Sequence, residues 1–197
     1  MRDNRRARKV CSMKSKTFRI RGDAGLILHN ARLSDPLDPW AMAIKEISGK
    51  RKKTTDDLIE MAKREFLGSM YEGEGGPCIP AQNLERLLRD GATHMKLGKV
   101  VQSSLIVLEE APIIYEGPKD YEKLWSEERF RCRASCKVKQ SRVIRTRPIF
   151  LDWSLEFTAA FHEERIDEAQ VDEILNIAGL FVGLGDWRPR HGRFSVE

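Results

Sequence analysis

The sequence predicts an α+β domain in which a mostly antiparallel sheet carries helices on one face. Every second residue is apolar over 153–161, which is the pattern of a strand with one buried face. Leucines and alanines recur at helical spacing over 82–95, which predicts an amphipathic helix. Along the chain, the expected order is strand, helices, strands, helix and final strand. A ferredoxin-like βαββαβ core with a helical insertion fits this order.

The N-terminal segment 1–16 is rich in lysine and arginine and lacks apolar periodicity. We therefore expect a flexible basic arm there, followed by a single domain over 17–197. The first strand is predicted from Phe18 to His29, with a bend at the two glycines inside this range.

A helical insertion is predicted over about 39–76. Asp38 is placed to cap its first helix, and Pro39 suits the first helical position. The second helix is expected to begin near Thr55 and to continue to about Met70, where a glycine-rich loop follows.

Three further elements are expected between the insertion and the C-terminus. Residues 100–108 are strand-like, and residues 120–128 form a short acidic segment with helical character. Asp167 is placed to cap the last helix.

A basic hairpin is predicted over about 129–148, since residues 129–147 include eight basic residues and no acidic one. Alternation places the cations of the first strand on one face and small or apolar residues on the other. The cations are Arg131, Arg133, Lys137 and Lys139 on the first strand, and Arg142, Arg145 and Arg147 on the return. Such a run of like charges repels itself without a counter-ligand, which favours a polyanionic partner; a merely solvated face is the alternative.

A glycine-rich and arginine-rich loop is predicted between the last helix and a short final strand. Glycines allow a close approach of the backbone, and arginines offer planar forks that suit phosphate. The candidate residues are Gly183, Gly185, Trp187, Arg188, Arg190, His191 and Arg193, joined by Arg19 and Arg21 on the polar face of the first strand. An ordinary helix end followed by an edge strand with solvated arginines remains the alternative.

The net charge of +5 and the absence of an apolar span or an export signal predict a cytoplasmic protein with no membrane partner. The four cysteines show no metal-ligand spacing, so we expect reduced thiols, no metal and no cofactor. The segregated positive charge favours a polyanionic partner, of which nucleic acid, either RNA or DNA, is the commonest.

Two segments together resemble the RAMP superfamily, the RNA-binding proteins of CRISPR systems. Residues 78–89 (CIPAQNLERLLR) are similar to that family's Ile-Pro segment, which opens a helix. Residues 183–194 (GLGDWRPRHGRF) are similar to its C-terminal glycine-rich loop. The best match is to backbone subunits that coat guide RNA, or to phage-encoded relatives.

The resemblance implies a modified RNA-recognition-motif fold that holds single-stranded RNA across a sheet face and the glycine loop. It also implies several copies in a row along the strand, in a prokaryotic or phage-infected cell. The chain departs from the family in its short length and in its helical segment 36–72. The aromatic stacking pattern of ordinary RNA-recognition motifs is absent, which favours a sequence-neutral grip on the backbone.

Two other functions stay open at this point. His29 lies where processing endonucleases of the superfamily often place a histidine, and Asp35 lies where some backbone subunits place a catalytic aspartate. The other reading of Asp35 is a turn residue. The third possibility is an interaction or inhibitor protein whose basic face meets a protein partner.

Overall fold

The computed structural model describes residues 13–138 and 140–197, and it confirms the α+β class with antiparallel sheets. A four-stranded sheet has the order β10-β1-β9-β5, with every neighbouring pair antiparallel. The strands are β1 (Met13–Gly22), β5 (Leu105–Val107), β9 (Ser154–His162) and β10 (Phe194–Val196). With a helix before β5 and another before β10, this is the strand order of a ferredoxin-like core.

One face of this sheet is apolar because the sequence alternates along its two long strands. Phe18 pairs with Phe157 and Ile20 pairs with Leu155, and all four side chains are buried. The positions between them place Arg19 opposite Glu156 on the exposed face. A shift of one residue in the register would turn the buried side chains toward water, so burial fixes the register.

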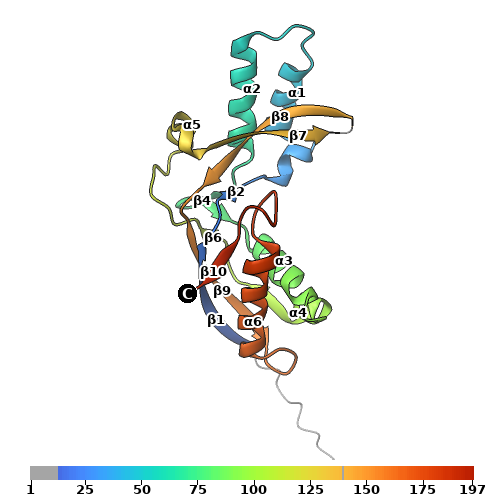
Figure 1. Cartoon of the computed structure of the whole chain (residues 1–197), viewed down its shortest axis with the longest axis vertical. Helices are drawn as coiled ribbons and strands as arrows, with labels where there is room; N and C mark the ends of the chain where they lie inside the picture. The colour runs from blue at the N-terminus through green and yellow to red at the C-terminus, as the bar shows by residue number, and fades with distance from the viewer. Residues whose placement is uncertain (1–12, 139) are drawn as a thin grey trace, which may run out of the picture.

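Helices cover the apolar face (Figure 1). Helix α3 (Ala81–Thr93) and helix α6 (Glu168–Ile177) pack side by side, and α4 (Gly98–Ser104) lies against α3. Their leucines and isoleucines join the strand residues in one continuous core. Helix α6 begins at Asp167, whose side chain and that of Gln170 form a reciprocal capping box.

A second antiparallel sheet, of order β2-β8-β7, extends from the first. Its strands are β2 (Leu26–Ile27), β7 (Arg131–Val138) and β8 (Ser141–Phe150). Strands β7 and β8 form the predicted basic hairpin, in the register that pairs Cys132 with Arg147. Figure 1 shows the hairpin lying between the helical insertion and the ferredoxin-like core.

The helical insertion consists of α1 (Pro39–Ser48) and α2 (Thr55–Gly68), preceded by the 3-10 turn η1 (Ala31–Ser34). Asp38 caps α1 as predicted, with its carboxylate 2.8 Å from the Trp40 amide. A small sheet of β3 (Glu72–Gly73), β4 (Gly76–Ile79) and β6 (Ala111–Pro112) follows, and α5 (Tyr121–Ser126) leads through η2 (Glu128–Phe130) into the hairpin.

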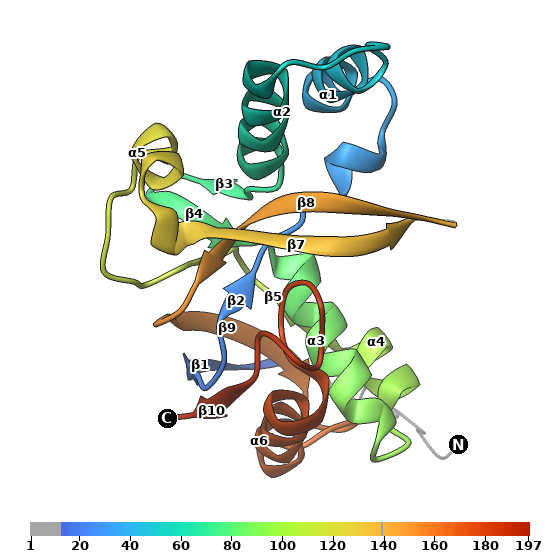
Figure 2. The same cartoon turned by 45° about the horizontal axis from the view of Figure 1, so that its top comes forward.

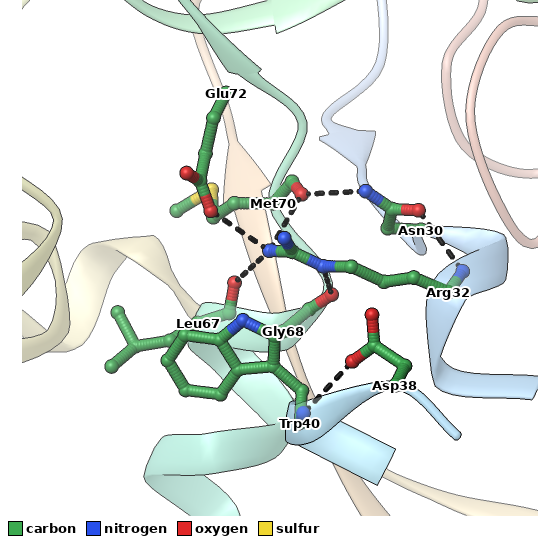
Figure 3. Close-up of polar contacts among 8 residues, drawn as sticks. All are labelled: Asn30, Arg32, Asp38, Trp40, Leu67, Gly68, Met70 and Glu72. Carbon is green, nitrogen blue, oxygen red and sulfur yellow. Dashed lines mark hydrogen bonds and ion pairs between the residues drawn. The ribbon is translucent and has the colours of Figure 1, made fainter. Parts of the chain in front are cut away.

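Arg32 anchors the C-terminal end of α2 (Figure 3). Its guanidinium donates to the carbonyl oxygens of Gly68, Leu67 and Met70 at 2.9, 3.2 and 3.3 Å, and it lies over the Trp40 ring. The last carbonyls of a helix have no partner within the helix and carry partial negative charge, so a cation there is stabilising. Trp40 is itself partly buried and packs against the hydrophobic core.

The structure differs from the expected elements in three places. Strand β1 begins at Met13, so residues 13–16 belong to the sheet, and the rest of the predicted arm lies outside the described residues. Most of the expected strand 100–108 is helix α4, because Val101 is buried against α3 while β9 pairs only with residues 105–107. A short apolar run is compatible with either a strand or a buried helix, and tertiary packing determines which of the two forms. The expected loop at 73–76 is the turn of the β3–β4 hairpin.

No helix in the described part of the chain combines the length and the apolar character needed to cross a membrane.

Candidate nucleic-acid interface

The glycine-rich loop, residues 183–193, is folded back on itself. The Leu184 amide donates to the Gly192 carbonyl at 2.8 Å, and the His191 amide donates to the Trp187 carbonyl at 3.3 Å. Gly192 has a φ of +72°, and a Cβ there would lie 1.7 Å from the Leu184 carbonyl oxygen. Only glycine can occupy this crossing point.

The loop is docked on β2 and on the segment that precedes it. The Asp186 amide donates to the Ile27 carbonyl at 2.8 Å, and the Gly192 amide donates to the Gly25 carbonyl at 3.0 Å. Gly185 has a φ of +76°, and a Cβ there would lie 2.3 Å from the Ile27 oxygen. The glycines therefore allow the loop backbone to lie directly on another strand, as the sequence indicated.

Arg147 joins the loop to the hairpin. Its guanidinium forms an ion pair with the Asp186 carboxylate and lies 4.9 Å from the centroid of the Trp187 ring. The Arg147 side chain is only 13% exposed, and burial lowers its pKa, although a guanidinium remains charged at neutral pH. Arg147 is thus a structural link, and it is not available to a phosphate in this arrangement.

A groove of about 600 Å³ lies between β7 and the glycine-rich loop. Figure 2 shows how the backbones of these two segments are placed, with the loop before β10 facing the β7–β8 hairpin. We call this groove the hairpin–loop groove. Its β7 side is formed by Cys132, Ala134, Ser135, Cys136 and Lys137, and its loop side by Trp187, Arg190 and His191. The small side chains on the β7 side leave the groove open, and β7 is the edge strand of its sheet within the described residues.

The predicted cations divide into a neutralised set and an unpaired set. Three have carboxylate partners besides Arg147: Arg19 with Glu156, Arg145 with Glu65, and Arg188 with Asp90 at 3.7 Å. Arg193 donates to the Pro189 carbonyl, and Arg131 lies over the Trp125 ring. Of the predicted cations, those that are exposed and make no ion pair or hydrogen bond within the described part of the chain are Arg21, Arg133, Lys137, Arg142 and Arg190.

The cations of the hairpin lie on both of its faces. Because directly opposed residues share a face, Arg142 lies with Lys137, whereas Arg145 lies with Ala134. Arg147 likewise shares its face with Cys132. The single cationic face expected from β7 therefore does not continue along the whole return strand. Lys139 lies outside the described residues.

Arg19 and Arg21 are not brought to the groove, because they lie on the exposed face of the four-stranded sheet. Asp35 is an exposed turn residue whose carboxylate accepts from the Leu37 amide at 2.9 Å. This contact matches the turn reading.

His29 lies beside two cavities of about 350 and 140 Å³. Burial, together with the charges of Arg147 and Arg145, lowers the pKa of its imidazole to about 4. The ring is therefore neutral at pH 7, and its buried Nδ1 has no hydrogen-bond partner among the residues that the structure describes. The larger cavity also contacts Glu65 and Ser69, and the smaller contacts Asn83 and Arg86.

Glu65 is the main site residue that the sequence did not reveal. One carboxylate oxygen forms the ion pair with Arg145, and the other accepts from the Thr146 amide at 3.1 Å. The acid occupies a buried position on α2, where a carboxylate is uncommon without a partner. Its place on the apolar stripe of that helix was the available signal.

Comparisons with known proteins give little. No protein-family model matches the chain, and no curated protein matches it. Among solved structures, the chain is similar to the crystal structure of Cmr6 from Pyrococcus furiosus, over 94% of this chain and 99% of that chain. The identity is 8% and the TM-score is 0.44, so this likeness establishes neither a family nor a function for the chain.

Proposed function

We propose that this protein binds single-stranded nucleic acid, with RNA preferred, in the hairpin–loop groove. The observation that carries the proposal is the set of unpaired cations on and around this groove. Lys137 of the edge strand β7 and Arg190 of the docked loop line the groove from opposite sides. Arg133 is also an exposed cation of β7, but it does not line the groove. Cations without carboxylate partners on both sides of an open groove attract a phosphate chain.

Trp187 favours a single strand over a duplex. Its ring is half-buried at the groove and is supported on one side by Arg147. A base can stack on such a ring only when it is free of its own duplex, and base–aromatic stacking is typically worth about 1–3 kcal/mol. The side chains along β7 within the groove are otherwise small or cationic, which supports a grip on the backbone with little base reading.

The two segments that resemble the RAMP superfamily support RNA as the ligand. The Ile-Pro segment opens α3, and the glycine-rich segment forms the loop side of the groove. As in backbone subunits of that superfamily, we propose that several copies bind along one strand. The protein itself performs no cleavage in this proposal.

The test is a double charge reversal of the two arginine and lysine residues that line the groove, Lys137→Glu with Arg190→Glu, measured by fluorescence anisotropy with single-stranded RNA at several salt concentrations. Contact with about four phosphates gives a log–log salt slope near −2.8 for a single strand, and loss of two contacts reduces it to about −1.4. We expect the affinity to fall at least about tenfold. Unchanged affinity and slope would reject this groove as the binding site.

A matched control is Lys99→Glu with Arg165→Glu. Both residues are exposed, and neither makes an ion pair within the described residues. Lys99 lies on α4, and Arg165 follows β9, so the control changes net charge equally at sites away from the groove. Equal losses in both double variants would indicate a response to overall charge alone.

A second proposal, metal-independent RNA cleavage by His29, is favoured by one observation. The neutral imidazole lies beside two cavities, near Arg145 and Arg147, and a neutral imidazole can accept a proton from a ribose hydroxyl. Incubation of labelled RNA with wild type and His29→Ala tests it. Cleavage that is absent, or that survives the substitution, removes it.

A further inference from the structure

We infer that the outer edge of β7 recognises the ribose 2′-hydroxyl through its backbone carbonyls, so that the hairpin–loop groove selects RNA over DNA. This inference rests on the proposed function and assigns the chemical basis of its ligand preference. The residues concerned are Arg133, Ser135 and Lys137, which alternate along this edge; Ser135 and Lys137 also line the groove.

The pairing of β8 determines which backbone groups point outward. Pro148 accepts from the Leu28 amide on the β2 side of β8, and Thr146 donates on the same side to Glu65. Residues at odd positions of β8, such as Arg147 and Arg145, therefore direct their N–H and C=O groups toward β7.

The register then assigns the outward groups of β7. Cys132 and Ala134 lie opposite Arg147 and Arg145, so they form the hydrogen-bonded pairs of the ladder. The alternate residues Arg133, Ser135 and Lys137 direct their N–H and C=O groups to the opposite edge. Among the described residues, none of these groups has a hydrogen-bond partner in another segment.

The chemistry of a nucleic-acid backbone makes this edge selective. Phosphate and sugar-ring oxygens only accept hydrogen bonds, so they can use the edge amides but not the edge carbonyls. The 2′-hydroxyl is the one donor that RNA adds to its backbone. A carbonyl covered by DNA loses water without gaining a partner, whereas RNA supplies one at every nucleotide.

The spacing of the edge suits an alternating ligand. Outward amides and carbonyls recur every second residue, which is about 6.6 Å along a strand. Exposed cations accompany them at Arg133 and Lys137. Donors and cations for phosphates thus alternate with acceptors for sugars along one line, which requires no particular base sequence.

The experiment compares four single-stranded oligonucleotides of one mixed sequence: RNA, DNA, 2′-fluoro RNA and 2′-O-methyl RNA. Affinities are measured by anisotropy at one salt concentration. The 2′-fluoro and 2′-O-methyl strands keep a ribose substituent but lack the hydroxyl donor. We expect the affinity for RNA to be at least about tenfold higher than that for each of the other three strands. Without the 2′-hydroxyl donor, two or more hydrogen bonds to the edge carbonyls are lost.

Equal binding of RNA and 2′-fluoro RNA would overturn the inference while leaving single-strand binding intact. Absence of binding to all four strands would instead overturn the proposed function itself. Ser135→Ala removes the one side-chain hydroxyl at the edge and should keep the RNA preference. Loss of the preference in this variant would assign recognition to the side chain and would refute the role of the backbone.

Amide hydrogen exchange locates the contact. The amides of Arg133, Ser135 and Lys137 should exchange rapidly in the free protein and slow at least about tenfold under saturating RNA, while those of Cys132 and Ala134 are already protected. Unchanged exchange at the three outward positions would place the strand elsewhere and overturn the assignment.

Discussion

Substitution of Gly185 by alanine should separate the glycine-rich loop from the rest of the fold. The new Cβ would lie 2.3 Å from the Ile27 carbonyl oxygen and 2.8 Å from a methyl of Leu26, at a residue whose φ is +76°. The nearest obstacle is backbone, which cannot rotate away as a side chain can. The loop must therefore move off β2.

Two contributions determine how far Gly185→Ala lowers the free energy of unfolding. A non-glycine residue in a left-handed conformation costs about 1–2 kcal/mol. Displacement of the loop also removes the hydrogen bond from the Asp186 amide to Ile27, which contributes about 0.5–1.5 kcal/mol. We expect Gly185→Ala to lower the free energy of unfolding by about 2–4 kcal/mol, the upper part reflecting loss of the ion pair between Asp186 and Arg147.

The assay is urea denaturation followed by circular dichroism, with Gly75→Ala as the matched control. Gly75 has no heavy atom within 4 Å of its added Cβ, so that variant should stay within about 0.5 kcal/mol of wild type. In conditions where Gly185→Ala remains folded, its affinity for single-stranded RNA should also fall. Stability equal to that of the Gly75 variant would refute the described docking of the loop.

Three further perturbations test other parts of the site. As pH falls from 6.5 to about 4, the free energy of unfolding of wild type should decrease by about 1–2 kcal/mol more than that of His29→Asn. The reason is that the imidazole of the unfolded chain takes up a proton, while the folded imidazole, with its pKa near 4, stays largely neutral. Urea denaturation at several pH values measures this, and equal decreases in the two proteins would contradict it. Glu65→Ala should cost about 1–3 kcal/mol by leaving the Thr146 amide without an acceptor and Arg145 without its carboxylate, and Glu65→Gln should cost less; thermal denaturation of both checks the order. Arg32→Ala should cost about 2 kcal/mol through its lost contacts with the end of α2, and Arg32→Lys should restore only part of this in urea denaturation, since an ammonium lacks the planar fork.

The core and the hairpin could be predicted because each depends on local periodicity. Phe18 and Phe157 lie on the buried faces of two strands in which apolar and polar residues alternate. This pattern is visible in the sequence whichever strand each of them pairs with. The cap at Asp167 was equally visible, since its signal and its contact lie within one turn of helix. These features require no knowledge of what lies across the fold.

The charge balance of the site could not be predicted, because it depends on contacts between distant segments. Arg147 and Asp186 lie on different elements, and nothing local indicates that they pair. Glu65 likewise meets Arg145 only after α2 packs beside β8. Four of the expected cations, Arg19, Arg145, Arg147 and Arg188, are therefore neutralised by carboxylates from elsewhere in the chain.

Strand β8 is fixed by contacts on two sides, which reduces the conformational entropy that the protein loses when it binds a nucleic-acid strand. Glu65 of α2 accepts a hydrogen bond from the Thr146 amide of β8, and Arg147 of β8 forms an ion pair with Asp186 of the docked loop. Both sides of the groove are thereby set before any ligand arrives. An incoming strand must give up its own freedom, but the protein gives up little, so a few phosphate contacts suffice for useful affinity.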